Sequence, residues 1–262
     1  MNQLYLGDCI KTMKNYINDK SIDLIYSDLP FNTTKAKWDN KIDFEQLWIE
    51  FKRILKDDGV IALHATQPFT TELINSNKNM WKYNWFWKKG KDRGGNFMNA
   101  KNSPIKVIEE ICIFSNNKVK HNKFENRLKY NPQGLIEYDK KVKGRRKQST
   151  TSLENSHNFS RPYHQNEYIR KYTNYPTNLV EFKHEQYDIG LHPTQKPLRW
   201  CEFIIKTYTK EEDIVLDCCM GAGTIPLAAL KNNRKYIGIE LLDEFYLKSL
   251  DRIFNYQINN KI

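Results

Sequence analysis

A carboxylate, a proline and an aromatic ring follow directly after one of the most apolar stretches of the chain. Residues 21–26 read as a buried strand, and after Ser27 the sequence continues as Asp28, Leu29, Pro30 and Phe31. The turn after a buried strand is ordinarily built from small polar residues, whereas Phe31 is large and apolar. A carboxylate can accept hydrogen bonds, and an aromatic ring can stack on a flat partner. The segment is therefore interpreted as part of a site rather than as a simple turn.

A glycine-rich turn near the C-terminal end offers a place for a small ligand. Residues 213–224 read DIVLDCCMGAGT, a strand that ends in Asp217 and is followed by Gly221, Gly223 and Thr224. Glycines between a strand and a helix let a ligand approach the backbone, and the helix N-terminus offers free N–H donors. The spacing matches neither the dinucleotide pattern GxGxxG nor a phosphate-binding loop.

A second strand with an acidic end follows this turn. Residues 235–240 read KYIGIE, so the strand ends in Glu240. In doubly wound sheets an acid in this position accepts hydrogen bonds from ribose hydroxyls. Together with the glycine turn, this acid predicts a cofactor of the nucleoside type.

The two motifs together resemble the signature of amino-group DNA methyltransferases, in which an Asp-Pro-Pro-Tyr type tetrapeptide meets an S-adenosylmethionine site. The order, tetrapeptide first and glycine turn last, resembles the β class of DNA adenine-N6 methyltransferases. The resemblance extends to LYLGDC at 4–9, ALHATQPF at 62–69, MNAKNSPIKVIEEICIF at 98–114, YNPQG at 130–134 and GLHPTQKP at 190–197. The chain departs from the pattern where Leu29 and Phe31 replace the commoner Pro and Tyr, and where Cys218-Cys219 replaces Pro-Phe.

This resemblance implies that Asp28, Leu29, Pro30 and Phe31 are the catalytic residues. Asp28 and the backbone carbonyl of Leu29 would accept hydrogen bonds from an exocyclic amine and draw its nitrogen toward tetrahedral geometry. Pro30 would stiffen the turn, and Phe31 would stack on a base taken out of the duplex. Related enzymes that methylate cytosine N4 typically carry Ser where this chain has Asp28, so the resemblance favours adenine.

The same resemblance implies a set of contacts to S-adenosylmethionine. Asp8 and Cys9 would lie beside the adenine of the cofactor, and Thr194 and Lys196 near its methionine end, where Lys can pair with a carboxylate. The predicted cofactor-binding residues are Asp8, Cys9, Asp28, Thr194, Lys196, Asp217, Cys218, Gly221, Gly223, Thr224 and Glu240. His192 is interpreted as a hydrogen-bonding residue of its turn rather than as a catalytic one.

Short apolar runs predict the strands that position these motifs. They lie at 4–6, 22–26, 60–63, 83–87, 111–114, 214–216 and 236–239. Helical patterns lie at 44–55, 68–75, 198–208, 224–230 and 243–254. This alternation predicts an α/β sheet with helices on both faces. The resemblance implies a Rossmann-like methyltransferase sheet, circularly permuted, with its catalytic half in residues 1–116 and its S-adenosylmethionine-binding half in residues 185–262.

The stretch between the two halves, residues 117–184, differs in composition and is predicted to be an inserted target-recognition region. Residues 117–175 carry 14 basic and 5 acidic side chains, interleaved with tyrosines. The predicted DNA-binding residues are Lys140, Lys141, Lys143, Arg145, Arg146 and Lys147. The alternative is a solvated surface loop, because low apolar content and like charges disfavour packing.

The composition of the whole chain agrees with a polyanionic partner. Its 262 residues carry 42 Lys plus Arg against 31 Asp plus Glu, a formal net charge of +11, which favours nucleic acid, although a Lys-rich source would give the same balance. Five cysteines without a CxxC pair indicate neither a disulfide framework nor a metal site. No signal peptide or membrane span is evident, so we expect a cytoplasmic protein of a bacterial, archaeal or phage-infected cell.

These observations predict a site-specific DNA methyltransferase that transfers a methyl group from S-adenosylmethionine to N6 of a flipped-out adenine in double-stranded DNA. Three alternatives stay open: a cytosine-N4 methyltransferase, an RNA adenine-N6 methyltransferase and a catalytically inactive DNA-binding relative. A homodimer and a cognate restriction endonuclease are open as partners. The recognition sequence is not readable from the chain.

Overall fold

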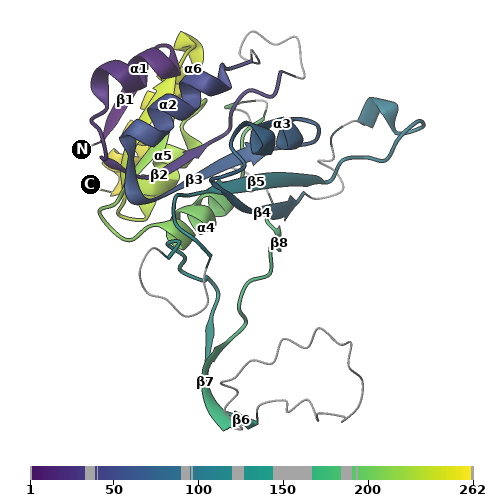
Figure 1. Ribbon diagram of the computed structural model, residues 1–262. Helices are drawn as coiled ribbons and strands as arrows, with labels where there is room; N and C mark the ends of the chain where they lie inside the picture. The colour runs from purple at the N-terminus through teal and green to yellow at the C-terminus, as the bar shows by residue number, and fades with distance from the viewer. Residues whose placement is uncertain are drawn as a thin grey trace. The chain divides into compact units, whose positions relative to one another are not determined.

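The larger of two compact units holds an eight-stranded mixed sheet (Figure 1). The computed structural model describes residues 2–32, 39, 41–89, 95, 97–119, 127–143, 167–183, 191–192 and 194–260. The larger unit comprises Met1–Asn131 and Thr177–Ile262, and the smaller comprises Pro132–Pro176. The smaller unit contains a two-stranded antiparallel ribbon, β6 (Ile136–Lys143) paired with β7 (Glu167–Thr173).

The strands of the large sheet lie in the order β1-β10-β9-β2-β3-β5-β4-β8. Their bounds are Gln3–Leu6 for β1, Ile22–Ser27 for β2, Leu55–Ala65 for β3, Trp81–Lys88 for β4, Ile108–Phe114 for β5, Leu179–Glu181 for β8, Ile214–Asp217 for β9 and Lys235–Glu240 for β10. The five strands from β1 to β3 are mutually parallel, β5 is antiparallel to both of its neighbours, and β8 runs parallel to β4.

Helices cover both faces of this sheet. They are α1 (Cys9–Tyr16), α2 (Phe44–Ile54), α3 (Phe69–Ser76), α4 (Leu198–Tyr208), α5 (Thr224–Lys231) and α6 (Asp243–Asn260), with a single 3-10 turn at Phe97–Asn99. Ile25 of β2 packs with α1, α2 and α3 in one buried cluster. Its neighbour Leu24 packs with α4, α5 and α6 in the other. Because successive strand side chains point to opposite faces, the molecule has a three-layer α/β/α core.

Strand β2 lies inside this core and is buried along its whole length. A parallel strand that is covered on both faces needs apolar side chains at every position, which explains the continuous run Ile22, Leu24, Ile25 and Tyr26. Asp23 interrupts the run at 3 % exposure. Its carboxylate accepts hydrogen bonds from Nζ of Lys56 (2.7 Å) and from the backbone N–H of Ile214 (3.0 Å).

The parallel strands deliver acidic residues to one edge of the sheet. Asp28 follows β2, Asp217 ends β9, Glu240 ends β10 and Asp8 follows β1 by two residues. The chain proceeds outward from β2 to β3 and, in the opposite direction, from β9 to β10. In open α/β sheets ligands bind at the carboxyl ends of strands, where the direction of winding switches. A site is therefore expected just outside the carboxyl ends of β2 and β9.

The predicted α/β sheet with helices on both faces is confirmed, and each predicted strand and helix overlaps an observed element. Helix α1 and strands β6, β7 and β8 were not predicted. The compact unit Pro132–Pro176 lies within the predicted insertion 117–184, while the division into 1–116, 117–184 and 185–262 stays a prediction. None of the helices in the described residues is both long and apolar enough to cross a membrane.

Candidate active site

A cavity of about 1250 Å³ opens at the carboxyl ends of the parallel strands. Segments from both ends of the chain line it, which is a consequence of the sheet order. The predicted residues among its lining are Asp8, Cys9, Asp28, Leu29, Pro30, Phe31, Thr194, Lys196, Asp217, Cys218, Gly221, Thr224 and Glu240. The structure therefore brings together every predicted catalytic and cofactor residue except Gly223.

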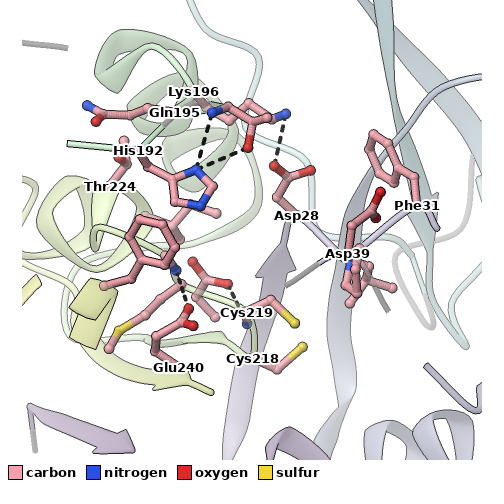
Figure 2. A pocket seen from close by; sticks show the side chains of 18 of the residues that line it. Asp28, Phe31, Asp39, His192, Gln195, Lys196, Cys218, Cys219, Thr224 and Glu240 are labelled. Atoms are coloured by element: carbon pink, nitrogen blue, oxygen red, sulfur yellow. Dashed lines mark hydrogen bonds and ion pairs between the residues drawn. The ribbon is translucent and has the colours of Figure 1, made fainter. Parts of the chain in front are cut away.

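The two carboxylate oxygens of Asp28 have different surroundings. Oδ2 lies 2.9 Å from Nζ of Lys196, and Figure 2 shows the other oxygen turned toward Phe31. This second oxygen, Oδ1, is buried and has no hydrogen-bond partner among the described residues. A buried acceptor without a donor costs free energy until a ligand supplies one. Asp28 thus has one oxygen fixed by the protein and one left for a donor in the cavity.

Lys196 is held between two acids. Its Nζ lies 2.9 Å from Asp28 Oδ2 and 2.7 Å from Glu109 Oε1, and the residue is 8 % exposed. Burial alone would lower the pKa of Lys196, but Asp28 and Glu109 raise that pKa above its ordinary value. Two of the three ammonium donors are used by the chain itself, so the contact of Lys196 with a cofactor carboxylate stays a prediction.

Glu109 extends this network into the sheet. Its Oε1 also lies 2.7 Å from Nδ1 of His64, and its Oε2 lies 2.6 Å from Nζ of Lys89. The other ring nitrogen of His64 lies 3.1 Å from the hydroxyl of Tyr26. With the His64 proton assigned to Nδ1, the ring donates to Glu109 and accepts from Tyr26. Although burial opposes it, the positive charge of Lys196 and the contacts of His64 and Lys89 hold the pKa of Glu109 well below its usual range.

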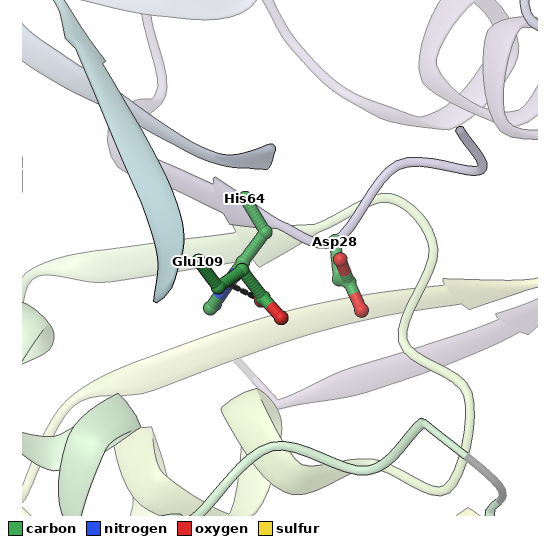
Figure 3. A group of neighbouring side chains, drawn as sticks. All are labelled: Asp28, His64 and Glu109. Atoms are coloured by element: carbon green, nitrogen blue, oxygen red, sulfur yellow. Dashed lines mark hydrogen bonds and ion pairs between the residues drawn. The ribbon is translucent and has the colours of Figure 1, made fainter. Parts of the chain in front are cut away.

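Asp28, His64 and Glu109 also have the donor types of a metal centre. Their ligand atoms lie within 4.8 Å of one another, and Figure 3 shows His64 against Glu109 with Asp28 opposite. However, Nζ of Lys196 already bridges the two acids, and Lys89 contacts the second oxygen of Glu109. Two cations therefore balance two carboxylates, and we interpret the group as an ion-pair network that orients Asp28.

Ser27 joins the strand that carries Asp28 to the strand that carries the glycine turn. Its hydroxyl donates to Asp217 Oδ1 at 2.6 Å and accepts the backbone N–H groups of Cys218 and Cys219, each at 3.1 Å. The backbone pairing between β2 and β9 ends at Ile25. The fully buried Ser27 side chain thus links the two strands at the point where their backbones separate to open the cavity.

The glycines of the turn have two different physical roles. Gly221 has φ +51°, lines the cavity and donates its N–H to Glu240 Oε2 at 2.9 Å. Gly223 has φ +73° and caps the N-terminus of α5. A Cβ atom at Gly223 would lie 2.9 Å from Cβ of Ser249 on α6. Gly223 does not line the cavity. Its positive φ and its close approach to α6 explain why the residue is a glycine.

The acids around the turn are held by backbone donors. Glu240 accepts from Gly221 and from the N–H of Leu242, one on each oxygen, so each oxygen keeps a further lone pair. Burial raises the pKa of Glu240. Burial also raises the pKa of Asp217, to about 7, against the hydrogen bonds from Ser27 and the Cys219 N–H that lower it. The carboxyl groups of Glu240 and Asp217 suit a ligand that brings hydroxyl donors or positive charge.

The remaining predicted cofactor residues have local structural contacts as well. Asp8 accepts the N–H of Lys11 at 2.9 Å and so caps α1. Nδ1 of His192 accepts the N–H of Thr194 at 3.2 Å, as expected for a hydrogen-bonding residue of the turn. Both amide atoms of Gln195 are buried without a partner in the described residues, and Figure 2 shows the amide pointing away from Asp28.

The aromatic side of the cavity is formed by Phe31. Its ring packs against that of Phe69, with centroids 4.9 Å apart. Leu29 directs its side chain into the core at 2 % exposure, which leaves its backbone as the polar part. Beyond Phe31 the chain is fixed by Asp39, whose carboxylate accepts the N–H of Asn32 at 2.7 Å.

The predicted DNA-binding residues divide into two groups. Lys140, Lys141 and Lys143 lie on β6 of the smaller unit. Arg145, Arg146 and Lys147 lie outside the described residues.

Sequence reasoning assigned no role to three residues that the structure places behind Asp28. Ser27 precedes the tetrapeptide, while His64 and Glu109 lie inside the quoted stretches ALHATQPF and MNAKNSPIKVIEEICIF. A polar residue within a mostly apolar strand is the signal that each of them gives, because a buried polar group requires a partner. The signal does not single them out, since β2 also carries Asp23 and β5 also carries Glu110.

Comparisons with known proteins agree with this geometry. Residues 22–250 match the family model N6_N4_Mtase, described as DNA methylase. The type II methyltransferase M1.MboII of Moraxella bovis is 27 % identical over 94 % of this chain and 94 % of its own length. M.HpaI of Haemophilus parainfluenzae is 26 % identical over 96 % of this chain and 74 % of its own length.

Two solved structures share the fold. The crystal structure of the M1.HpyAVI–SAM complex superposes with a TM-score of 0.61 at 20 % identity, covering 97 % of this chain and 99 % of that one. The PvuII DNA methyltransferase, described as cytosine-N4-specific, gives a TM-score of 0.61 at 16 % identity over 98 % of this chain and 92 % of that one. Since the family model spans most of the sheet and the site, this chain belongs to the N6/N4 family of DNA methylases.

Proposed function

We propose that this DNA methyltransferase uses S-adenosylmethionine to methylate the N6 amino group of an adenine that has been flipped out of duplex DNA. The observation that carries the proposal is the unequal environment of the Asp28 carboxylate. Oδ2 is anchored by Lys196, and Oδ1 is buried, unpartnered within the described residues and turned toward Phe31. A hydrogen-bond acceptor beside an aromatic ring fits an amine attached to a flat heterocycle.

The residues around the glycine turn fit the proposed cofactor. Asp8, Asp217 and Glu240 line one cavity together with Gly221, and they offer acceptors to ribose hydroxyls and negative charge to a cationic ligand. Relatives of the same fold include the M1.HpyAVI–SAM complex. When bound, S-adenosylmethionine supplies an electrophilic methyl group on a positively charged sulfur.

The chain's own residues prepare the amine. An exocyclic amine is a weak nucleophile because its lone pair is delocalised into the ring. Asp28 Oδ1 accepts one N–H, and the backbone carbonyl of Leu29 accepts the other, which draws the nitrogen toward tetrahedral geometry and frees the lone pair. Phe31 stacks on the base and Lys196 keeps Asp28 in the required orientation. Removal of the base from the duplex is necessary, since the amine is otherwise paired.

Adenine is proposed over cytosine because Asp28 stands where enzymes acting on cytosine N4 typically carry Ser. The likeness in fold to the cytosine-N4-specific PvuII enzyme keeps cytosine as the second candidate. Both bases present an amine beside a ring nitrogen acceptor, so the same network would serve either.

The proposal is tested by incubating the protein with S-adenosylmethionine labelled on its methyl group and with duplex DNA, then digesting the DNA to nucleosides. We expect label in N6-methyladenine. Label in N4-methylcytosine would overturn the choice of base, and label found on RNA alone would overturn the choice of nucleic acid. Cofactor binding without any transfer would leave a DNA-binding relative as the better description.

Residues 117–184 are proposed to recognise the target sequence, because this stretch carries most of the chain's excess positive charge.

A companion restriction endonuclease is proposed from the type II names of relatives such as M1.MboII. Both are tested by sequencing DNA from cells that express the protein: a methylated sequence identifies the site, and a nuclease blocked by that methylation identifies the companion.

A further inference from the structure

The segment between β4 and β5 exposes two large apolar side chains next to each other. Phe97 is 72 % exposed and Met98 is 98 % exposed, the two highest values among the large apolar side chains of the described residues. Both lie in the 3-10 turn Phe97–Asn99, and Figure 1 shows this segment projecting away from the sheet beyond α3. Single apolar side chains are common on protein surfaces, but two adjacent ones on a projecting turn indicate a binding surface.

The turn that carries them has a fixed backbone. The N–H of Ala100 donates to the carbonyl of Phe97 at 3.1 Å, and the N–H groups of Asn102 and Ser103 donate to the carbonyl of Asn99 at 2.8 and 3.0 Å. The two apolar side chains are thus presented on a preformed support. A preformed support lowers the entropy cost of inserting them into a partner.

The base of the segment lies at the rim of the cavity. Gly95 and Lys106 exchange backbone hydrogen bonds of 2.8 and 2.9 Å, and both residues line the cavity. Lys88, the last residue of β4, pairs with Ile108, the first residue of β5, and Ile108 lines the cavity as well. The turn is therefore anchored beside the place where the proposed function puts the flipped base.

The segment also has the charge of a surface that approaches nucleic acid. Residues 89–107 carry five basic side chains and one acidic side chain, and no acid occurs between residues 95 and 107. An apolar tip among cations fits duplex DNA, in which phosphates lie outside an apolar stack of bases. An apolar pocket on another protein would not require the excess of positive charge.

We propose that Phe97 and Met98 form a wedge that enters the duplex beside the target base and holds that base in its extrahelical position. This inference rests on the proposed function, which supplies the flipped base. A base that leaves the stack leaves a gap, and Phe and Met are among the side chains that proteins insert between base steps. The wedge contacts neither the amine nor the cofactor, so both are positioning residues.

The test compares double variants that remove similar apolar groups from different places. Phe97→Ala with Met98→Ala removes the wedge. The matched control is Phe254→Ala with Ile258→Ala, at side chains of α6 that are 60 % and 58 % exposed and do not line the cavity. Phe97→Leu with Met98→Leu keeps an apolar tip and should stay close to wild type.

Methyl transfer is measured in single turnovers on two duplexes that contain the target sequence. One duplex is fully paired, and the other has an abasic site opposite the target base, so that extruding this base costs less. Loss of the wedge should lower the rate on the paired duplex by about 5- to 100-fold, the range typical of a lost base–aromatic stack. The loss on the abasic duplex should be much smaller, and the control should match wild type on both.

Flipping is also measured without knowledge of the target sequence. A long duplex in which 2-aminopurine replaces part of the adenine is used, because this base fluoresces more strongly when it leaves the stack. We expect wild type and the control to raise the fluorescence, and the wedge variant to raise it less. Cofactor affinity, measured by calorimetry, should be the same in every variant because the altered side chains are exposed.

Equal losses on the paired and the abasic duplex would overturn the inference, because they would reflect DNA contact in general rather than flipping. A dimer that dissociates only in the wedge variant would assign the tip to a second copy of the chain and overturn it as well. If the wild-type protein methylates DNA and the wedge and control variants do not differ, the inference fails alone. If the fluorescence shows the expected contrast but no methyl group is transferred, the proposed function fails alone; absence of DNA binding overturns both.

Discussion

The cavity and the ribbon use the same charged residue types in opposite settings. In the cavity, Glu109 and Lys196 are almost fully buried, and each forms ion pairs with two residues of opposite charge. On the ribbon, Lys140 and Arg170 are exposed and have no ion-pair partner among the described residues. A buried charge must be paired for the chain to fold, whereas an exposed charge can stay unpaired at little cost. In the cavity the proposed chemistry therefore rests on one carboxylate oxygen of Asp28, whereas the predicted DNA-binding lysines of the ribbon lie on both of its faces.

The largest effect is expected from removing that oxygen. Asp28→Ala should lower methyl transfer by at least about 10²- to 10³-fold with little change in cofactor affinity, because its acceptor acts on the amine in the transition state. Single-turnover kinetics and calorimetry measure the two quantities. Asp57→Ala, at a side chain that is 91 % exposed, is the control and should be active. Turnover close to wild type in Asp28→Ala would remove this carboxylate from the mechanism.

A change in the buried network should reduce stability more than the same change at the surface. Glu109→Gln leaves the buried Lys196 and the partly exposed Lys89 with less negative charge, and breaking a buried pair typically costs about 3–5 kcal/mol. Glu181→Gln breaks an exposed pair with Lys88, 3.1 Å apart, and should cost less than about 1 kcal/mol. Urea denaturation gives both free energies of unfolding. Similar values for the two variants would contradict the contrast between buried and exposed pairs.

Ser27→Ala should have a smaller effect that reaches both halves of the site. The variant removes the acceptor of the Cys218 N–H and a donor to Asp217, and an unsatisfied buried group costs about 1–3 kcal/mol. We also expect weaker cofactor binding, since the same hydroxyl holds the start of the glycine turn. Ser21→Ala, at an exposed hydroxyl that donates to Asn18, is the control. Unaltered cofactor affinity in Ser27→Ala would limit Ser27 to a role in stability.

The last prediction concerns pH. The pKa of Asp217 is raised by burial to about 7, above the value of about 3.9 for an unfolded Asp, so the folded state binds an extra proton between these two pH values. This contribution to stability is fully present below about pH 4 and is lost as the pH rises to about 7. Asp217→Asn should therefore remove part of the decline in unfolding free energy over that window. Parallel pH curves for variant and wild type, measured with urea, would argue against the raised pKa.

The sheet could be predicted because its strands carry their signal locally. The run at 22–26 is apolar except for Asp23, and the acids at Asp28, Asp217 and Glu240 mark strand ends that a parallel sheet brings to one edge. Helix α1 was missed because its cap Asp8 and its first residue Cys9 were interpreted for the cofactor alone. The ribbon was missed because the strand IEYDKKVK is exposed on both faces and so lacks the alternation that marks a half-buried strand.

The pairing within the site could not be predicted for a different reason. Glu109 contacts Lys196, His64 and Lys89 across wide separations in sequence, and no local pattern specifies which buried acid will meet which base. The same holds for the Lys196 ammonium, which a motif places near a cofactor but which the fold directs toward Asp28. Motifs predicted the position of the site, and the contacts between strands determine what each side chain does there.

The balance of Asp28 and Glu109 by two lysines, Lys89 and Lys196, also restricts how this chain can change over generations. Loss of either Glu109 or Lys196 alone removes one of the two ion-pair partners of a buried charge, so selection acts on the first substitution before a second can compensate it. The exposed ribbon has no such barrier, since its cations can be replaced one at a time. Descendants of this protein can therefore vary the charge of the ribbon in small steps, while the charged group around Asp28 is inherited as a block.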